Sequence, residues 1–270
     1  MNLFEATLLG VIQGVTEFLP ISSSGHLLLA RELLGIGQES QAAFIFDVLV
    51  QLGTWVAILI YFWKDLAGIA VDMWQGLRGR AAPQARLGWL LALATIPAVL
   101  AGWLIKEAMT GEISGLLLTG AFLMTNALLM GLAELAGRRT RQIENMNSKD
   151  AVWIGAFQAL ALLPAVSRSA ASMAGGLTRN LTRPAAARFA FLLAVPVMPA
   201  AALVALLDLG SLPSAGSLLL PLGIGFLAAT VVGYLSIRWL LNYLARHSLY
   251  PFAIYCLVVG LAAIVISGMA

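Results

Sequence analysis

Two short polar runs interrupt apolar stretches of this chain, and both contain residue types that act on phosphate groups. In the first run, Gln13 and Glu17 lie four residues apart and therefore share one face of a helix. His26 follows them, and the second run supplies Arg168. The two runs also contain six serines and one glycine: Ser22, Ser23, Ser24, Gly25, Ser167, Ser169 and Ser172.

Together these side chains have the functions needed to transfer a phosphoryl group. Ser23 or Ser24 is a candidate nucleophile, and His26 is a candidate base or an alternative nucleophile; of these arrangements we favour Ser23 as nucleophile with His26 as its base. Glu17 can act as a metal ligand or a base, and the guanidinium of Arg168 can hold phosphoryl oxygens through the transition state. Attack by water activated by His26 or Glu17 is a further route. We predict catalytic roles for Glu17, Ser23, His26 and Arg168, and substrate binding by Ser22, Ser24, Gly25, Ser167, Ser169 and Ser172.

Simpler roles compete with each of these assignments. Serines at a helix start can serve only as caps. His26 can be a hydrogen-bonded packing residue, and Glu17 with Arg168 can be a purely structural ion pair. Gln13 can form a hydrogen bond between packed helices rather than bind a metal.

Each polar run combines a helix stop with residues that cap a new helix, so two short helices begin there. The free amide groups and the positive dipole end of a helix N-terminus form an anion site, which phosphate commonly occupies. Arg168 and two dipole ends contribute about +2 and Glu17 removes one charge, which leaves about +1. A diphosphate carries about two to three negative charges. We therefore predict a divalent cation, Mg²⁺ or Ca²⁺, bound by oxygens of Gln13 and Glu17.

The composition indicates a membrane protein. Of the 270 residues, 60% are apolar and 11% are charged, and the mean hydropathy is +0.91, whereas about a quarter of the residues in soluble domains are charged. The length allows at most about eight spans of about 20 residues, which excludes a large aqueous domain. The net charge of +3 is scattered between apolar segments. Because no basic stripe or aromatic platform accompanies it, we expect no nucleic-acid partner.

Six segments are long and apolar enough to cross the bilayer: 42–63, 87–106, 115–136, 185–207, 217–241 and 250–269. Two others, about 2–34 and 151–177, are broken by a proline and a polar run. Because irregular backbone at membrane depth needs a protein-lined or water-lined cavity, we predict that both are re-entrant hairpins with tips near the midplane. Asp47 and Gln51, near the start of the first span, either line this cavity or lie at the membrane interface.

The predicted fold is an all-α integral membrane protein with a single membrane domain over residues 1–270. Each half has one re-entrant helical hairpin and three transmembrane helices, and the odd number of crossings inverts the second half relative to the first. The first inverted repeat spans 1–136 and the second spans 151–270. In agreement, Gly10 and Gln13 recur as Gly155 and Gln158.

Basic residues predict the orientation. Loops 64–86, 137–150, 178–188 and 238–249 hold thirteen of the sixteen Lys and Arg residues. The opposite face keeps Arg31 and Lys106, and the 208–216 connection has neither Lys nor Arg. Because cytoplasmic loops are enriched in Lys and Arg, we predict that the basic loops are cytoplasmic and that both termini lie outside.

The motifs resemble those of a known family. Gln13-Gly-Val-Thr-Glu17-Phe-Leu-Pro-Ile-Ser-Ser-Ser-Gly-His26 is similar to the (E/Q)xxxE and SS(T/S)GH signature of bacterial undecaprenyl-diphosphate phosphatases of the bacitracin-resistance type. The similarity covers nearly the whole chain. It continues through Phe46-Asp-Val-Leu-Val-Gln51-Leu-Gly53, Pro164-Ala-Val-Ser167-Arg168-Ser169, Phe191-Leu-Leu-Ala-Val-Pro196 and Pro251-Phe-Ala-Ile-Tyr255.

This resemblance implies an enzyme of the bacterial cytoplasmic (inner) membrane that hydrolyses undecaprenyl diphosphate to undecaprenyl phosphate, recycling the carrier lipid for peptidoglycan synthesis. It also implies divalent-cation dependence, an inverted-repeat fold and a site that opens outward. By motif position, the family's functional residues fall on Gln13, Glu17, Ser23, His26, Arg168 and Ser172. The chain departs from the family's PGxSRSGxT pattern at three positions: Ala165 and Ala170 replace glycines, and Ser172 replaces the threonine.

Two other functions are weighed against this one. A transporter or flippase of an anionic lipid phosphate would share the inverted repeats and broken helices, but it needs no nucleophile. A phosphatase of the phosphatidic-acid type would need a second catalytic histidine after Ser167-Arg168, where the chain has Ala174. We also consider that the protein forms a homodimer.

Overall fold

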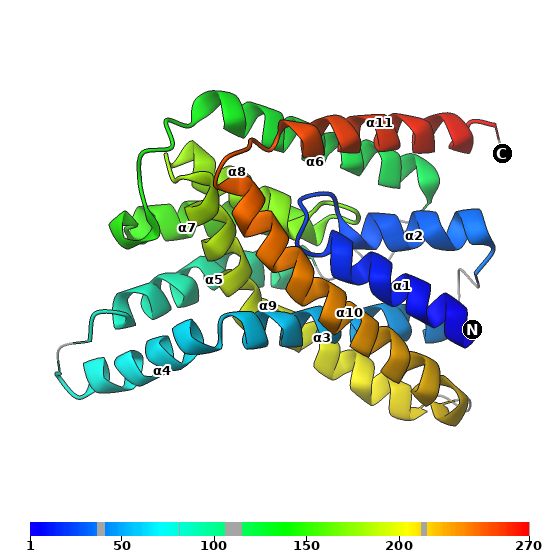
Figure 1. Cartoon of the computed structure of the whole chain (residues 1–270), viewed down its shortest axis with the longest axis horizontal. Helices are drawn as coiled ribbons and strands as arrows, with labels where there is room; N and C mark the ends of the chain where they lie inside the picture. Colours follow the sequence, from blue (N-terminus) through cyan, green and yellow to red (C-terminus); the bar gives the residue numbers. More distant parts are fainter. Residues whose placement is uncertain (37–40, 81, 106–114, 212–214, 270) are drawn as a thin grey trace.

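The computed structural model describes residues 1–36, 41–80, 82–105, 115–211 and 215–269, and these segments are helical (Figure 1). Within them the β contact is an isolated bridge between Arg141 and Leu181. The elements in chain order are α1 (Leu3–Thr16), α2 (Ser23–Leu34), α3 (Gln41–Tyr61), α4 (Trp63–Leu77), α5 (Ala85–Ile105), α6 (Leu116–Ala136), η1 (Ile143–Asn145), α7 (Ser148–Ala159), η2 (Leu160–Leu162), α8 (Arg168–Thr178), α9 (Arg183–Ser211), α10 (Ala215–Leu244) and α11 (Tyr250–Ser267).

Five helices are long and apolar enough to cross a membrane: α3, α5, α6, α10 and α11. They match five of the six predicted spans and make this a multi-pass membrane protein. The sixth predicted span, 185–207, lies within the single helix α9. Lys106, at the end of another predicted span, and residues 212–214 of the 208–216 connection lie outside the described residues.

Helix α4 corrects one expectation from the sequence. The segment 64–86 is predicted as a loop, but most of it forms α4, packed against α5. Ile69 and Met73, one turn apart, contact α5 at Gly88, where an added Cβ would lie 2.3 Å from Met73 Sδ. Ile69 and Met73 form an apolar stripe at helical spacing, and a helix allows both side chains to be buried against α5.

Two pairs of short helices are each joined by an irregular turn. Residues 17–22 separate α1 from α2, while η2 and residues 163–167 separate α7 from α8. In Figure 1 both turns lie in the middle of the molecule, and the chain reverses there. At 1.5 Å per residue, α1 and α7 are about 20 Å long, which is shorter than the roughly 30 Å hydrocarbon core.

The two helix pairs pack in corresponding ways. Helix α1 lies against α10, α7 lies against α5, and α6 pairs with α11. The close approaches occur at glycines: a Cβ added to Gly10 would lie 2.4 Å from the carbonyl oxygen of Gly225, and one added to Gly155 would lie 2.2 Å from that of Ala94. Gly10 and Gly155 therefore allow backbone contact between helices at matching positions.

Ion pairs join the basic loops at one end of the molecule, opposite the end where the two termini lie in Figure 1. Glu134 at the end of α6 pairs with Arg139 and Arg183 and accepts the Leu249 N–H at the start of α11. Arg188 on α9 pairs with Asp65 on α4. The basic residues predicted as topology signals are thus also structural partners.

Asp150 forms a second buried cluster at this end. Its carboxylate accepts hydrogen bonds from Arg141 and Arg179 and from the Asn147 N–H. Burial alone would raise the pKa of Asp150, but these hydrogen bonds outweigh burial and hold the pKa below its usual range.

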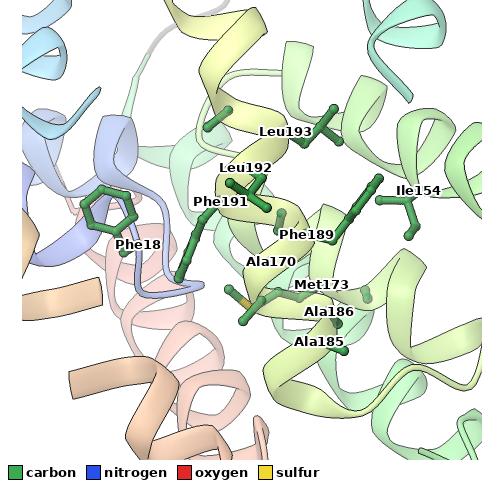
Figure 2. Close-up of a cluster of buried hydrophobic side chains, with 14 of the residues drawn as sticks. Phe18, Ile154, Ala170, Met173, Ala185, Ala186, Phe189, Phe191, Leu192 and Leu193 are labelled. Atoms are coloured by element: carbon green, nitrogen blue, oxygen red, sulfur yellow. The ribbon is translucent and has the colours of Figure 1, made fainter. Parts of the chain in front are cut away.

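The apolar core runs beneath the turn of the first helix pair. The ring of Phe18, in that turn, meets Phe191 of α9 edge to face at 5.3 Å between centroids. Figure 2 shows Phe18 at the edge of this cluster, beside Phe191, with Phe189 of α9 near Ala170 and Met173 of α8. This packing holds the first turn against the second helix pair.

Candidate active site

The turns of the two helix pairs are in contact with each other. A Cβ added to Gly25, in the first turn of α2, would lie 3.3 Å from the Cβ of Ala165. The Ser169 hydroxyl donates to the Leu19 carbonyl at 3.3 Å. The contacts bring together the N-termini of α2 and α8, and with them two sets of free amide groups.

Both helices begin with the same serine arrangement. Ser22 Oγ accepts the Gly25 N–H, and Ser167 Oγ accepts the Ala170 N–H, each at 3.2 Å. Ser24 lies 3.4 Å from Ser22, and Ser169 lies 3.0 Å from Ser167, measured between hydroxyl oxygens. Capping is therefore the role that the hydrogen bonds give Ser22 and Ser167.

Asn126 of α6 fixes the second turn. Its side-chain amide donates to the Ala165 carbonyl at 3.0 Å and accepts the Ser167 N–H at 2.8 Å. Ala165 has φ 56°, in the left-handed region that favours glycine. Sequence reasoning missed Asn126, since one amide side chain within a largely apolar span has no local pattern to mark it.

Glu17 is the centre of the site and is almost fully buried. One carboxylate oxygen accepts Arg168 Nη2 at 2.7 Å. The other accepts the Ser23 hydroxyl at 2.7 Å and Gln13 Nε2 at 2.9 Å. The sequence predictions for Gln13, Glu17, Ser23 and Arg168 therefore converge on four side chains that the structure brings into direct contact.

A cavity of about 500 Å³ opens beside this group. The exposed Phe44 also lines the cavity and belongs to the outer surface of α3. Arg31 and Asp47 form an ion pair of 2.6 Å in the wall, and Gln51 lines the wall as well. From the two polar runs, the wall includes Gln13, Glu17, Ser22, Ser23, Ser24, Ser167 and Arg168.

Four predicted site residues lie outside this wall, although the structure describes them all: Gly25, His26, Ser169 and Ser172. Gly25 and Ser169 take part in the contact between the turns. Ser172 is buried one turn after Arg168, and its hydroxyl has no hydrogen-bond partner among the described residues.

His26 is bonded to Ser22 and Tyr255 rather than to Ser23. Its Nδ1 lies 2.7 Å from the Ser22 carbonyl and its Nε2 lies 2.8 Å from the Tyr255 hydroxyl. Because the carbonyl only accepts, Nδ1 carries the hydrogen, and in a neutral ring Nε2 accepts from Tyr255. The sequence predicts no role for Tyr255 of α11. Its partner His26 is 229 residues away, so no local motif links the two.

The side chains around Glu17 suit a divalent cation that is completed by substrate. Among the described residues there is no group of three or more His, Cys, Asp and Glu that could hold a metal. Glu17, Gln13 and Ser23 offer one carboxylate and two neutral oxygen donors. Mg²⁺ commonly binds through one or two carboxylates together with substrate phosphates and water, so this donor set fits it.

Comparisons with known proteins agree with the geometry. The family model described as bacitracin resistance protein BacA matches residues 6–262. The chain is 41% identical to the undecaprenyl-diphosphatase of Chlorobaculum tepidum, over 99% of this chain and 98% of the relative. It is 40% identical to that of Corynebacterium striatum over 100% and 96%, and to that of Micrococcus luteus over 96% and 95%. The chain therefore belongs to the bacitracin resistance protein BacA family.

Proposed function

We propose that this multi-pass membrane protein is a hydrolase that cleaves undecaprenyl diphosphate into undecaprenyl phosphate and inorganic phosphate. The observation that carries this proposal is Glu17, which binds Ser23 with one oxygen and Arg168 with the other in a cavity wall. The family and its relatives named undecaprenyl-diphosphatase support the same reaction. Nothing among these matches favours a transporter or flippase. Recycling of the lipid carrier would serve cell-wall synthesis and bacitracin resistance.

The cavity fits the head group of such a lipid. Its volume of about 500 Å³ is that of a site for a drug-sized molecule, which is too small for a complete polyprenyl tail. Phe44 lines the cavity and is also exposed on the outer surface. The diphosphate would enter beside Arg168, while most of the tail would lie along the apolar exterior of the helices in the bilayer.

Ser23 is the nucleophile in this proposal and Glu17 is its base. The Ser23 oxygen forms a bond to the terminal phosphorus, and its proton passes to Glu17 over their 2.7 Å hydrogen bond. The bond from that phosphorus to the bridging oxygen breaks, and undecaprenyl phosphate leaves. Water then attacks the phosphoserine, and the bond from phosphorus to the Ser23 oxygen breaks. Glu17 returns its proton to that oxygen, the phosphate leaves with both protons of the water, and the Ser23 hydroxyl and the Glu17 carboxylate are restored.

Arg168 and the helix N-termini stabilise the charge that develops. The free amide groups of α2 and α8 and the guanidinium form a preorganised set of donors for phosphoryl oxygens. Gln13 and Glu17 would hold Mg²⁺ or Ca²⁺, which neutralises diphosphate charge when bound. Substrate binding remains the proposed role of four further serines: Ser24, Ser167, Ser169 and Ser172.

His26 has a positioning role in this arrangement. It bonds to the carbonyl of Ser22, whose φ of 77° directs the start of α2 and thereby places Ser23. Trapping with a diphosphate labelled in the terminal phosphate tests the nucleophile. We expect labelled phosphoserine in the wild-type protein and none in Ser23→Ala. Labelled phosphohistidine would instead identify His26 as the nucleophile, and the absence of any covalent product would indicate water.

The membrane arrangement is a proposal of the same kind. We infer an inverted repeat in which α1–α2 and α7–α8 are re-entrant hairpins. The matching contacts at Gly10 and Gly155 and the matching caps at Ser22 and Ser167 support it. The positive-inside asymmetry supports outside termini and an outward-opening site in the inner membrane.

Labelling tests this orientation. With Cys256 replaced by alanine, cysteines placed at Gly79 and Ser211 should react with an impermeant reagent from opposite sides of the membrane, and reaction from the same side would refute it. The proposal includes a homodimer, but the dimer is not needed to form the site. The cavity side chains named above all come from one chain. The mass of the detergent-solubilised protein tests that assembly.

Phosphate release from undecaprenyl diphosphate in detergent tests the function directly. The wild-type protein is expected to release phosphate, to stop when a chelator is added, and to recover with Mg²⁺ or Ca²⁺. A transporter would release none, because vectorial transport requires a sealed membrane. A folded wild-type protein without phosphate release would overturn the proposal.

A further inference from the structure

Gln158 is a buried amide in the cavity wall that no hydrogen bond satisfies. It lies near the end of α7, with 2% of its surface exposed, and it lines the same cavity as Glu17 and Arg168. Neither its Nε2 nor its Oε1 has a hydrogen-bond partner among the described residues. A buried polar group without a hydrogen bond is destabilising and uncommon in native proteins, so it needs an explanation.

The comparison of the two helix pairs explains why this amide has no partner. Gln158 corresponds to Gln13, whose Nε2 donates to Glu17 four residues later. Four residues after Gln158 the chain has Leu162, which also lines the cavity. The second helix pair therefore keeps the amide but lacks the carboxylate that satisfies it in the first pair.

A second unpaired group in the same wall indicates the chemistry of the missing partner. Arg168 uses Nη2 on Glu17, while its buried Nη1 has no hydrogen-bond partner among the described residues. An arginine nitrogen can only donate, and a glutamine Nε2 also donates. One ligand that satisfies both donors must present oxygen acceptors, as a phosphoryl group does, whereas a cation would satisfy neither donor.

We propose that Gln158 is a substrate-binding residue whose Nε2 donates to a phosphoryl oxygen of the diphosphate, beside Arg168 Nη1. This assignment rests on the proposed function and extends its site to the second helix pair. Because the amide is neutral, it adds binding without adding charge. Its contribution is to substrate and product binding, with no proton transferred and no bond broken at Gln158.

The substitution Gln158→Leu separates binding from structure. Removing a buried amide that has no hydrogen-bond partner should leave the melting temperature of the ligand-free protein unchanged or raised. Loss of a hydrogen bond to a charged group should raise KM and the inhibition constant of inorganic phosphate about 10- to 100-fold, with a smaller change in kcat. Gln158→Glu should weaken phosphate binding further, because a carboxylate repels the anion.

Gln75→Leu on α4, outside the cavity wall, is the matched control and should leave KM and phosphate inhibition unchanged. A folded Gln158→Leu protein with wild-type KM and wild-type phosphate inhibition would overturn the assignment. A lower melting temperature without ligand would also overturn it, because that result indicates a structural partner for the amide. Gln158→Met gives the same test if the leucine variant does not fold.

Failure of this assignment is distinguishable from failure of the proposed function. The melting shift caused by inorganic phosphate is measured without turnover, in wild type, Gln158→Leu and Gln75→Leu. A shift lost only in Gln158→Leu supports the assignment even if the wild type releases no phosphate from the lipid. A shift retained in Gln158→Leu overturns it even if the wild type is fully active.

Discussion

Glu17 and Arg168 are 151 residues apart in the sequence and form an ion pair of 2.7 Å. Glu17 follows the end of α1 and Arg168 begins α8, so the pair joins the two helix pairs at their turns. The Glu17 side chain is only 4% exposed and that of Arg168 is 15% exposed. A buried pair of this kind stabilises little on its own, which favours a function that uses both groups.

Glu17→Gln should reduce phosphate release about 100- to 10,000-fold, because it removes the acceptor for the Ser23 proton and the charged ligand for a cation. Arg168→Lys keeps the positive charge but loses the planar donor set, so a loss of about 100-fold is expected. Initial rates in detergent measure both effects. Melting temperatures serve as the control for folding, and a folded Glu17→Gln protein within about threefold of wild type would reject the role of Glu17 as base.

Ala165 and Ala170, on either side of the start of α8, should respond in opposite ways to substitution by glycine. Ala165 has φ 56°, where a Cβ costs about 1–2 kcal/mol, and part of the gain is offset by the greater freedom of glycine in the unfolded chain. Ala165→Gly should therefore raise the melting temperature. Ala170 lies in the first turn of α8, so Ala170→Gly should cost up to about 1 kcal/mol. Equal effects of the two substitutions would contradict this explanation.

The turns and the central charges could be predicted because their signals are local or exceptional. A proline followed by hydroxyl residues marks each helix break, and a charge within an apolar stretch is rare enough to identify Glu17 and Arg168. The pairing of Ser23 with Glu17 rather than with His26 could not be predicted. It depends on the backbone of the turn, where Ser22 has φ 77° and binds the His26 ring through its carbonyl.

Other partners could not be read from the sequence, because they come from distant spans. Tyr255 and Asn126 lie within largely apolar helices, and no local pattern distinguishes them from residues that only pack there. Their importance depends on which helices become neighbours. Helix α4 could not be predicted for a different reason: its amphipathic pattern lies in a segment that also carries the charged residues typical of a loop.

Asn126→Leu should destabilise the second turn. The substitution leaves the Ala165 carbonyl and the Ser167 N–H without their buried partner, at a cost of about 1–3 kcal/mol for each group. Because these groups set the start of α8, phosphate release should also fall. Thr125→Leu, one residue away on the exposed side of α6, is the control and should retain both stability and activity. Equal stability of Asn126→Leu and wild type would contradict a stabilising role for the two Asn126 hydrogen bonds.

Asp150→Asn should change the dependence of stability on pH. Since the pKa of Asp150 is lowered from its usual 3.8 in the folded protein, its stabilising contribution is present above about pH 4 and is lost as the pH falls through the folded value. At pH 7 the variant should be less stable by about 1–3 kcal/mol. The difference in melting temperature from wild type should shrink below about pH 4.

Asp65→Asn is the matched control, because its ion pair with Arg188 is partly exposed and such pairs contribute about 0–1 kcal/mol. Melting temperatures measured from pH 7 to pH 3 compare the three proteins. A difference between wild type and Asp150→Asn that stays constant over this range would show that Asp150 stabilises the fold by something other than its charge.

Gly10→Ala and Gly155→Ala should both be destabilising and should both reduce activity. The added Cβ would lie 2.4 Å from the Gly225 carbonyl oxygen in one case and 2.2 Å from that of Ala94 in the other, so α1 must move away from α10 and α7 from α5. Since α1 carries Gln13 and leads directly into Glu17, and α7 carries Gln158, the displacement should widen the site. Gly131→Ala is the control within α6, because a Cβ there meets no atom within 4 Å, and it should stabilise the helix by up to about 1 kcal/mol. Melting temperatures that rise in all three variants would show that the close contacts at Gly10 and Gly155 are not required.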